Sequence, residues 1–268
     1  MVEPETEPRR RTRAQVALLG IATLVVGLVG TLVIVLLADR ATRDERTHDE
    51  TAPGTGPHVE VATSEERALA QRRMVVLPPQ AAQPQPLAAT GTAGPALSLP
   101  EPTRVDGTWI PGGFPGTPEG ALAQLAALNE TALAGGDPAV YGRAYRALSQ
   151  DGAPPPESTG LHSVLTSFRS TAGLPAGGPV SGLRVTYQIT HGQVKGTASD
   201  GRYVVVCVLG QLAVEYQGRN SSVGVGDCQA MRRVDGRWRI AAGVLAAPAP
   251  SAWPGSADAV RAGYREVR

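Results

Sequence analysis

The two cysteines, Cys207 and Cys228, are the residues whose spacing most directly predicts a chemical bond. Both lie in a β-rich stretch, and the midpoint between them falls on the turn-like residues 217–220, which read Gln-Gly-Arg-Asn. An antiparallel hairpin centred there places the two cysteines nearly opposite each other, within bridging range. We therefore predict a disulfide. Two free buried thiols are the alternative. The spacing of the two cysteines is not that of a redox or zinc motif.

No other residues form a catalytic, metal-binding or phosphate-binding pattern. The histidines, His48, His58, His162 and His191, have no cysteine, second histidine or paired carboxylate at metal-ligand spacing. The sequence lacks a G-x-S-x-G elbow, a P-loop and a G-x-G-x-x-G motif after a strand. We therefore expect a protein that is not an enzyme and that holds no cofactor and no metal.

One acidic pair, Glu215 and Asp227, is a candidate for acid–base work if the hairpin brings the two carboxyl groups face to face. Arg219 and Arg232 lie near them in the same stretch of sequence. We favour a solvated sheet face over an acid–base pair, because isolated charges on strands are usually exposed.

A long apolar run near the N-terminus predicts a transmembrane helix over residues 14–38, from Ala14 to Ala38. The run contains no charged residue, and about 20 apolar residues span a bilayer core. Four arginines precede it, at positions 9, 10, 11 and 13, whereas both signs of charge follow it. The positive-inside rule then places residues 1–13 in the cytoplasm and the residues after about 39 outside. A cleaved signal peptide is the alternative, but its apolar region is shorter and ends at small residues.

Residues 39–106 read as a flexible extracytoplasmic linker. Their first part is polar, and Thr63 with Glu66 has the spacing of a helix capping box. Residues 77–106 are rich in proline and nearly free of aromatic side chains, so they should bury too little surface to fold. We expect a semi-extended spacer that separates a folded domain from the membrane.

Residues 107–245 predict a globular α+β domain. Thr117-Pro118 and Asp137-Pro138 each combine a capping side chain with proline at the first helical position. A third helix is expected near residues 161–168. Tyr141 and Tyr145, on one face of the second helix, are interpreted as core residues.

Strand signals follow these helices, and the apolar residues there recur with a period of two. They predict strands near residues 183–190, 202–217, 222–234 and 237–245, with an interruption at Gly210. Helices followed by antiparallel strands favour helices packed on one face of a curved sheet. Residues 246–268 are a C-terminal tail in which Ser256 caps a short helix, docked either on the domain or on a partner.

The pattern resembles a group of actinobacterial bitopic membrane proteins with a nuclear-transport-factor-2-like outer domain, often found with conjugation or type IV secretion genes. The resemblance rests on the apolar anchor, the proline-rich spacer, FPGTPEGALAQLAAL at the first helix and RRVDGRWRI at the last hairpin, and covers about residues 107–245. It implies a cone-like fold and a non-catalytic scaffold that contacts other subunits. It transfers no catalytic residue, because none matches.

The leading hypothesis is therefore a membrane-anchored structural or assembly subunit of a cell-envelope transfer machine. Its expected partners are the lipid bilayer and other membrane or envelope proteins, including a second copy of itself. A net charge of +1 gives no electrostatic reason to expect a nucleic-acid partner. The alternative is a small-ligand-binding protein that uses the interior of the cone. A signalling protein such as an anti-sigma factor ranks last, because the cytoplasmic tip is very short.

Overall fold

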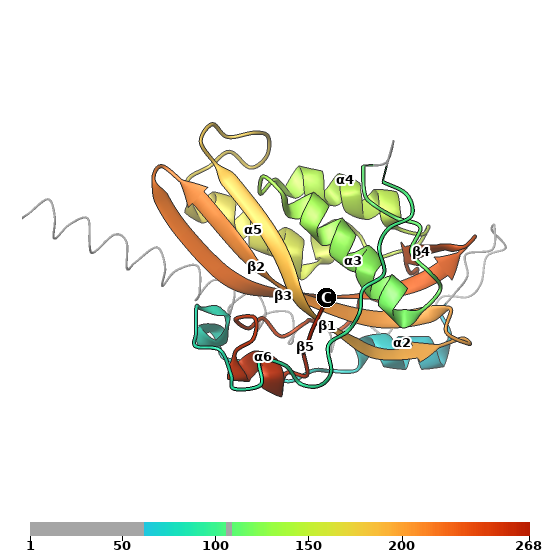
Figure 1. The fold of residues 1–268 in the computed structure, drawn as a ribbon. Helices are drawn as coiled ribbons and strands as arrows, with labels where there is room; N and C mark the ends of the chain where they lie inside the picture. The colour runs from blue at the N-terminus through green and yellow to red at the C-terminus, as the bar shows by residue number, and fades with distance from the viewer. Residues whose placement is uncertain (1–61, 106–108) are drawn as a thin grey trace, which may run out of the picture.

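The structure is a computed structural model that describes residues 62–105 and 109–268, and it has an α+β fold (Figure 1). Within these residues the helices and strands follow in this order: α2 (Ser64–Gln71), η1 (Pro79–Ala82), α3 (Pro118–Leu133), α4 (Pro138–Leu148), η2 (Pro156–Ser158), α5 (Gly160–Thr171), β1 (Arg184–Ala198), β2 (Tyr203–Tyr216), β3 (Arg219–Val234), β4 (Arg237–Ile240), α6 (Ala257–Arg261) and β5 (Arg265–Glu266).

The helix starts predicted from capping signals are confirmed. The Thr117 hydroxyl accepts a hydrogen bond from the Gly120 N–H at the start of α3, and Asp137 caps α4 through the Ala139 N–H. These bonds satisfy N–H groups that have no partner inside a helix. Thr63 and Glu66 form the predicted capping box at the start of α2.

The strands form one antiparallel sheet in the order β4-β3-β2-β1-β5. β2 lies at its centre and is buried on both faces, which explains its nearly continuous apolar run. The predicted interruption at Gly210 is wrong, because β2 continues through it to Tyr216. A Cβ at position 210 would lie 2.8 Å from the Tyr187 ring, so glycine there allows close packing rather than a break.

One face of the sheet carries the three main helices, α3, α4 and α5 (Figure 1). Val204, Val206 and Val208 of β2 point into this layer, together with leucines of α3 and the two tyrosines of α4. Tyr141 and Tyr145 are fully buried, as their predicted core role requires. Because Trp238 is buried here and donates from Nε1 to the Pro115 carbonyl, it fixes the chain that enters α3.

Residues 62–100, which we call the N-terminal strap, cover the opposite face together with the C-terminal tail, except that the end of the strap passes to the helix side, where Leu97 joins the core (Figure 1). This differs from the flexible linker expected for residues 39–106. The strap is ordered because it buries Ala70, Ala81 and Leu97 and makes backbone hydrogen bonds to the tail. Its backbone partners in the tail lie more than 150 residues later in the sequence, so its own composition does not reveal them.

The tail docks on the domain, and glycines of β3 make this docking close. A Cβ at Gly224 would lie 1.8 Å from the Ala252 carbonyl oxygen, and one at Gly226 would lie 2.5 Å from that of Pro250. The glycine-rich segment of β3 therefore serves backbone packing. The tail then adds β5 to the edge of β1, so the sheet has one strand more than the sequence predicted.

The last predicted strand, over residues 237–245, is shorter in the structure, because β4 ends at Ile240 and the chain turns away to begin the tail. The predicted membrane helix, Ala14–Ala38, lies outside the described residues. Within residues 62–105 and 109–268, no helix combines the length and apolar character needed to cross a bilayer.

Candidate functional site

A buried carboxyl group, that of Asp227 on β3, is the centre of a polar cluster between the sheet and the helices. Asn129 of α3 donates from Nδ2 to one carboxyl oxygen at 2.9 Å, and Gln229 donates from Nε2 to the other at 3.0 Å. The Tyr145 hydroxyl of α4 donates in turn to the Gln229 Oε1 at 3.4 Å. These three contacts connect α3, α4 and β3 through one hydrogen-bonded network.

Burial controls the ionisation of this cluster. It raises the pKa of Asp227 from its ordinary value of 3.8 to about 6, and the amide donors of Asn129 and Gln229 only partly oppose this effect. Burial and the nearby Asp227 carboxyl also raise the pKa of Tyr141 and that of Tyr145, so both phenols stay protonated. Near pH 6 the cluster can therefore bind or release one proton.

The cluster has one unused acceptor and no open path to it. Among the described residues, the Asn129 Oδ1 atom is buried without a hydrogen-bond partner. Asn129, Tyr145 and Gln229 are at most 2% exposed, and Asp227 is 6% exposed. A ligand that reaches the carboxyl group must therefore displace side chains.

A second charged cluster lies on the opposite face, beneath α2. The carboxylate of Glu66 accepts from Arg232 at 2.6 Å and from the Ser199 hydroxyl at 2.5 Å. Both ionic side chains are almost fully buried, and the Arg232 guanidinium lies 5.1 Å from the centre of the Tyr203 ring. Burial alone would raise the pKa of Glu66, but hydrogen bonds from Ser199, the Thr63 N–H and Arg232 outweigh it, so the pKa is lowered.

The predicted cross-strand pairing of Cys207 with Cys228 is confirmed. The two residues are register partners of β2 and β3, and their sulfur atoms lie at disulfide distance, 1.95 Å apart. The Met74 sulfur of the strap lies 3.7 Å from the Cys207 sulfur and 3.6 Å from the Cys228 sulfur. The pair therefore lies under the strap, on the face away from the helices.

We expect the full-length protein to show no titratable thiol when it is denatured without reductant, and two after reduction. A disulfide that closes a loop of this length stabilises a fold by about 3 kcal/mol. Cys207→Ala/Cys228→Ala should therefore lower the midpoint of urea unfolding, whereas reductant should not change the midpoint of the double variant. Two thiols in the unreduced protein would contradict the bridge.

The acidic pair considered from the sequence does not exist in the structure. Asp227 is opposite Val208, and Glu215 is opposite Asn220 near the exposed end of the hairpin, where it lies 3.9 Å from Arg184. The expectation of a solvated position is therefore wrong for Asp227. The difference arises because Asp227 lies further along β3, where the helices cover the sheet.

The histidines within the described residues do not form a site either. His162 lies on α5, and His191 lies on β1, where its Nε2 is 3.0 Å from the Gly91 carbonyl of the strap. Across residues 62–105 and 109–268 there is no group of three or more histidine, cysteine, aspartate or glutamate side chains placed to hold a metal. His48 and His58 lie outside the described residues.

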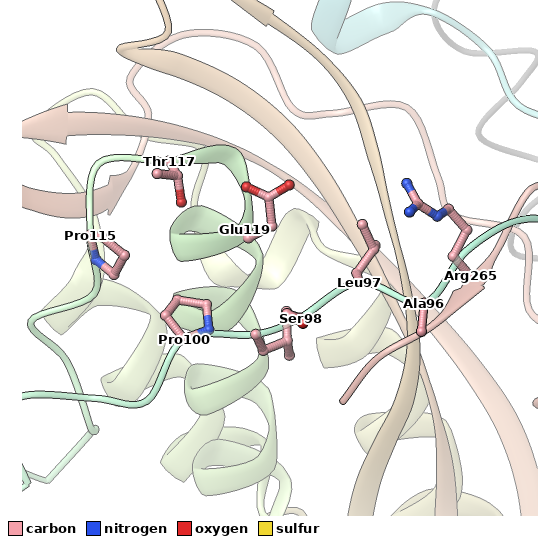
Figure 2. A pocket seen from close by; sticks show the side chains of 9 residues that line it. Ala96, Leu97, Ser98, Pro100, Pro115, Thr117, Glu119 and Arg265 are labelled. Atoms are coloured by element: carbon pink, nitrogen blue, oxygen red, sulfur yellow. The ribbon is translucent and has the colours of Figure 1, made fainter.

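An open groove of about 510 Å³ lies on the surface between the strap and the start of α3 (Figure 2). Residues 96–100 form one wall, while Pro115, Thr117 and Glu119 form the other. Thr117 is already engaged as the α3 cap, and Arg265 donates from Nε to the Pro95 carbonyl. Glu119 is the one acidic side chain that lines the groove.

The chain matches no known protein family, no curated protein and no solved structure.

Sequence reasoning missed both buried clusters. Asn129 carries the strongest signal available, because it is a polar residue on the otherwise apolar face of a predicted helix. Glu66 was identified only as part of a capping box, and nothing near it indicates that Arg232 is its partner.

Proposed function

We propose that the protein is a membrane-anchored, non-catalytic structural or assembly subunit of a cell-envelope machine of the conjugation or secretion type. Its outer domain, of the nuclear-transport-factor-2-like type, acts by contacting other envelope proteins or a second copy of itself. In this proposal residues 14–38 anchor the chain in the cell membrane, with the N-terminus in the cytoplasm and the domain outside. The order of three helices followed by antiparallel strands supports the fold type.

The observation that carries the proposal is the position of the exposed large apolar side chains. Among the described residues, those that are substantially exposed all fall between positions 75 and 109: Val75, Val76, Leu87, Val105 and Trp109. Of these, the large aromatic side chain of Trp109 is the one that best fits a protein contact. Trp109 is 49% exposed, and tryptophan is the residue type most enriched at the energetic centres of protein interfaces.

The surroundings of Trp109 hold it in place. An antiparallel bridge joins Arg104 to Gly112 through two backbone hydrogen bonds, and the buried Gln124 of α3 donates to the Pro111 carbonyl at 3.0 Å. The backbone beside Trp109 is therefore fixed to α3 before any partner arrives. Fixing the backbone on this side of Trp109 in advance reduces the conformational freedom that is lost on binding.

We expect a photo-crosslinking amino acid at position 109 of the full chain to give discrete higher-mass adducts in native membranes. The control is position 220, because Asn220 is exposed at the start of β3, far in the sequence from the stretch 75–109. Trp109→Ala should reduce recovery of the crosslinked partner about tenfold or more when the crosslinker is placed at a neighbouring position, since such residues often contribute 2 kcal/mol or more. Monomer alone at both positions, in correctly inserted protein, would count decisively against the proposal.

A small-ligand-binding protein is the second candidate, because polar groups of Asn129, Asp227 and Gln229 converge in the interior between helices and sheet. The burial of these residues favours the scaffold, since a ligand site needs space that side chains now fill. The Trp109 experiment separates the two functions, because a ligand-binding domain without a protein partner gives no position-specific adduct.

A further inference from the structure

The segment that follows α2 turns two aliphatic side chains outward. Met74 and Leu77 pack inward against the sheet, whereas Val75 and Val76 between them are 41% and 92% exposed. In the sequence Met-Val-Val-Leu, the first and last side chains therefore point inward and the two valines point outward. Two adjacent aliphatic side chains therefore lie on the domain surface.

Three exposed arginines lie close to these valines in the sequence. Arg67, Arg72 and Arg73 are exposed on α2 and directly after it, and Glu65 is the only exposed acidic residue of the same helix. Glu66 does not reduce this positive charge, because it points inward and is neutralised by Arg232. We call the surface of Arg67, Arg72, Arg73, Val75 and Val76 the basic ridge.

The neighbouring β1–β2 turn does not change the sign of the net charge of the basic ridge. The bond from Ser199 to Glu66 brings this turn beside α2, and its next charged residues, Asp200 and Arg202, carry one charge of each sign. Lys195 lies beneath the ridge and donates from Nζ to the Arg72 carbonyl at 2.6 Å. The turn therefore adds no net charge beside α2.

The basic ridge is held rigidly. The Lys195 bond fixes Arg72, and the contacts of Met74 with the two cysteine sulfurs fix the next turn of chain. The outward valines are therefore presented without an ordering cost at the moment of contact.

A surface with exposed aliphatic side chains among arginines fits the boundary of a bilayer that contains anionic phospholipids. The aliphatic groups enter the boundary between headgroups and acyl chains, while arginines pair with phosphate. In the sequence, the basic ridge follows soon after the proposed anchor and lies at the beginning of the described domain. Residues 39–61, which separate them, span at most about 80 Å when fully extended.

We propose that the basic ridge rests on the anionic headgroups of the membrane that holds the anchor, so that α2 sets the orientation of the domain on the bilayer. This inference rests on the proposed function, because it needs the domain and the bilayer surface to be on the same side. The contact adds a second, weaker attachment to the anchor. It leaves Trp109 available for a protein partner.

The test uses the full chain in vesicles of phosphatidylcholine, with or without about a third phosphatidylglycerol. An environment-sensitive fluorophore is attached at Val76→Cys and, as the matched control, at Asn220→Cys at the start of β3, at the other end of the sheet from the β1–β2 turn. At position 76 we expect a blue shift and at least twofold less quenching by acrylamide when phosphatidylglycerol is present. High salt and Arg67→Gln/Arg72→Gln/Arg73→Gln should both abolish this difference, and position 220 should not respond.

Two outcomes would overturn the inference while leaving the proposed function intact. The first is equal quenching at position 76 in both kinds of vesicle, in protein that stays with the vesicles after alkaline extraction. The second is protection of position 76 in native membranes but not in anionic vesicles, which would assign the ridge to a protein partner. Protein that alkaline extraction removes from the vesicles would overturn the anchor and this inference together.

Discussion

Replacing Asp227 with asparagine is expected to make the full-length protein harder to unfold at pH 7.5, by about 1–3 kcal/mol. The wild-type carboxyl group is buried, and its hydrogen-bond donors are the neutral amides of Asn129 and Gln229. At pH 7.5 it is ionised, and burial disfavours its charge. Asparagine removes the charge and keeps the shape, provided that the Gln229 amide rotates to receive the new N–H.

The dependence on pH follows from the direction of the pKa shift. Because the folded-state pKa is raised from 3.8 to about 6, the native protein binds this proton more tightly than the unfolded chain does. The stability that the proton contributes is complete below pH 3.8 and is lost as the pH rises through 6. A shift of this size corresponds to about 3 kcal/mol, since each pKa unit is worth about 1.4 kcal/mol.

Urea unfolding of wild type and Asp227→Asn between pH 4 and 8 measures this effect. The stability difference between them should grow in favour of the variant from pH 4 to about 6.5 and then stay constant. Asp151→Asn is the matched control, because Asp151 is exposed in a turn and its replacement should give no such slope. A difference that does not change with pH would show that Asp227 keeps an ordinary pKa in the folded protein.

Local signals in the sequence were sufficient for the helices, the hairpins and the cysteine pair. Thr117-Pro118 and Asp137-Pro138 mark helix starts because the cap and the fixed proline dihedral act within one turn. Cys207 and Cys228 could be paired because a hairpin centre fixes which residues lie opposite. Each of these inferences needs only neighbours in the chain or across one turn.

The buried clusters and the ordered strap could not be predicted in this way. Asp227 is buried because α3 and α4 cover that part of β3, and this depends on how the helices cross the sheet. The strap appears unable to fold when its own composition is considered, but its apolar partners come from the sheet and the tail. Stability that depends on contacts far apart in sequence leaves no local pattern.

The ion pair beneath α2 gives the second large effect, and it concerns the strap. Glu66→Ala is expected to destabilise the protein by about 3–5 kcal/mol, because it leaves Arg232 buried beside the Tyr203 ring without its carboxylate. The capping bond to the Thr63 N–H and the acceptor for the Ser199 hydroxyl disappear as well. Most of the loss should come from the buried guanidinium that no longer has this carboxylate beside it.

Paired substitutions separate these causes. Glu66→Met/Arg232→Met removes both charges and should recover much of the stability that Glu66→Ala loses, because apolar side chains can replace a buried ion pair. The matched control is Glu157→Ala, which breaks the half-exposed pair with Arg146 and should cost less than about 1 kcal/mol. Urea unfolding gives the free energies, and hydrogen exchange in α2 shows whether the strap opens before the sheet. If Glu66→Ala opens neither α2 nor the sheet, the pair does not hold the strap in place.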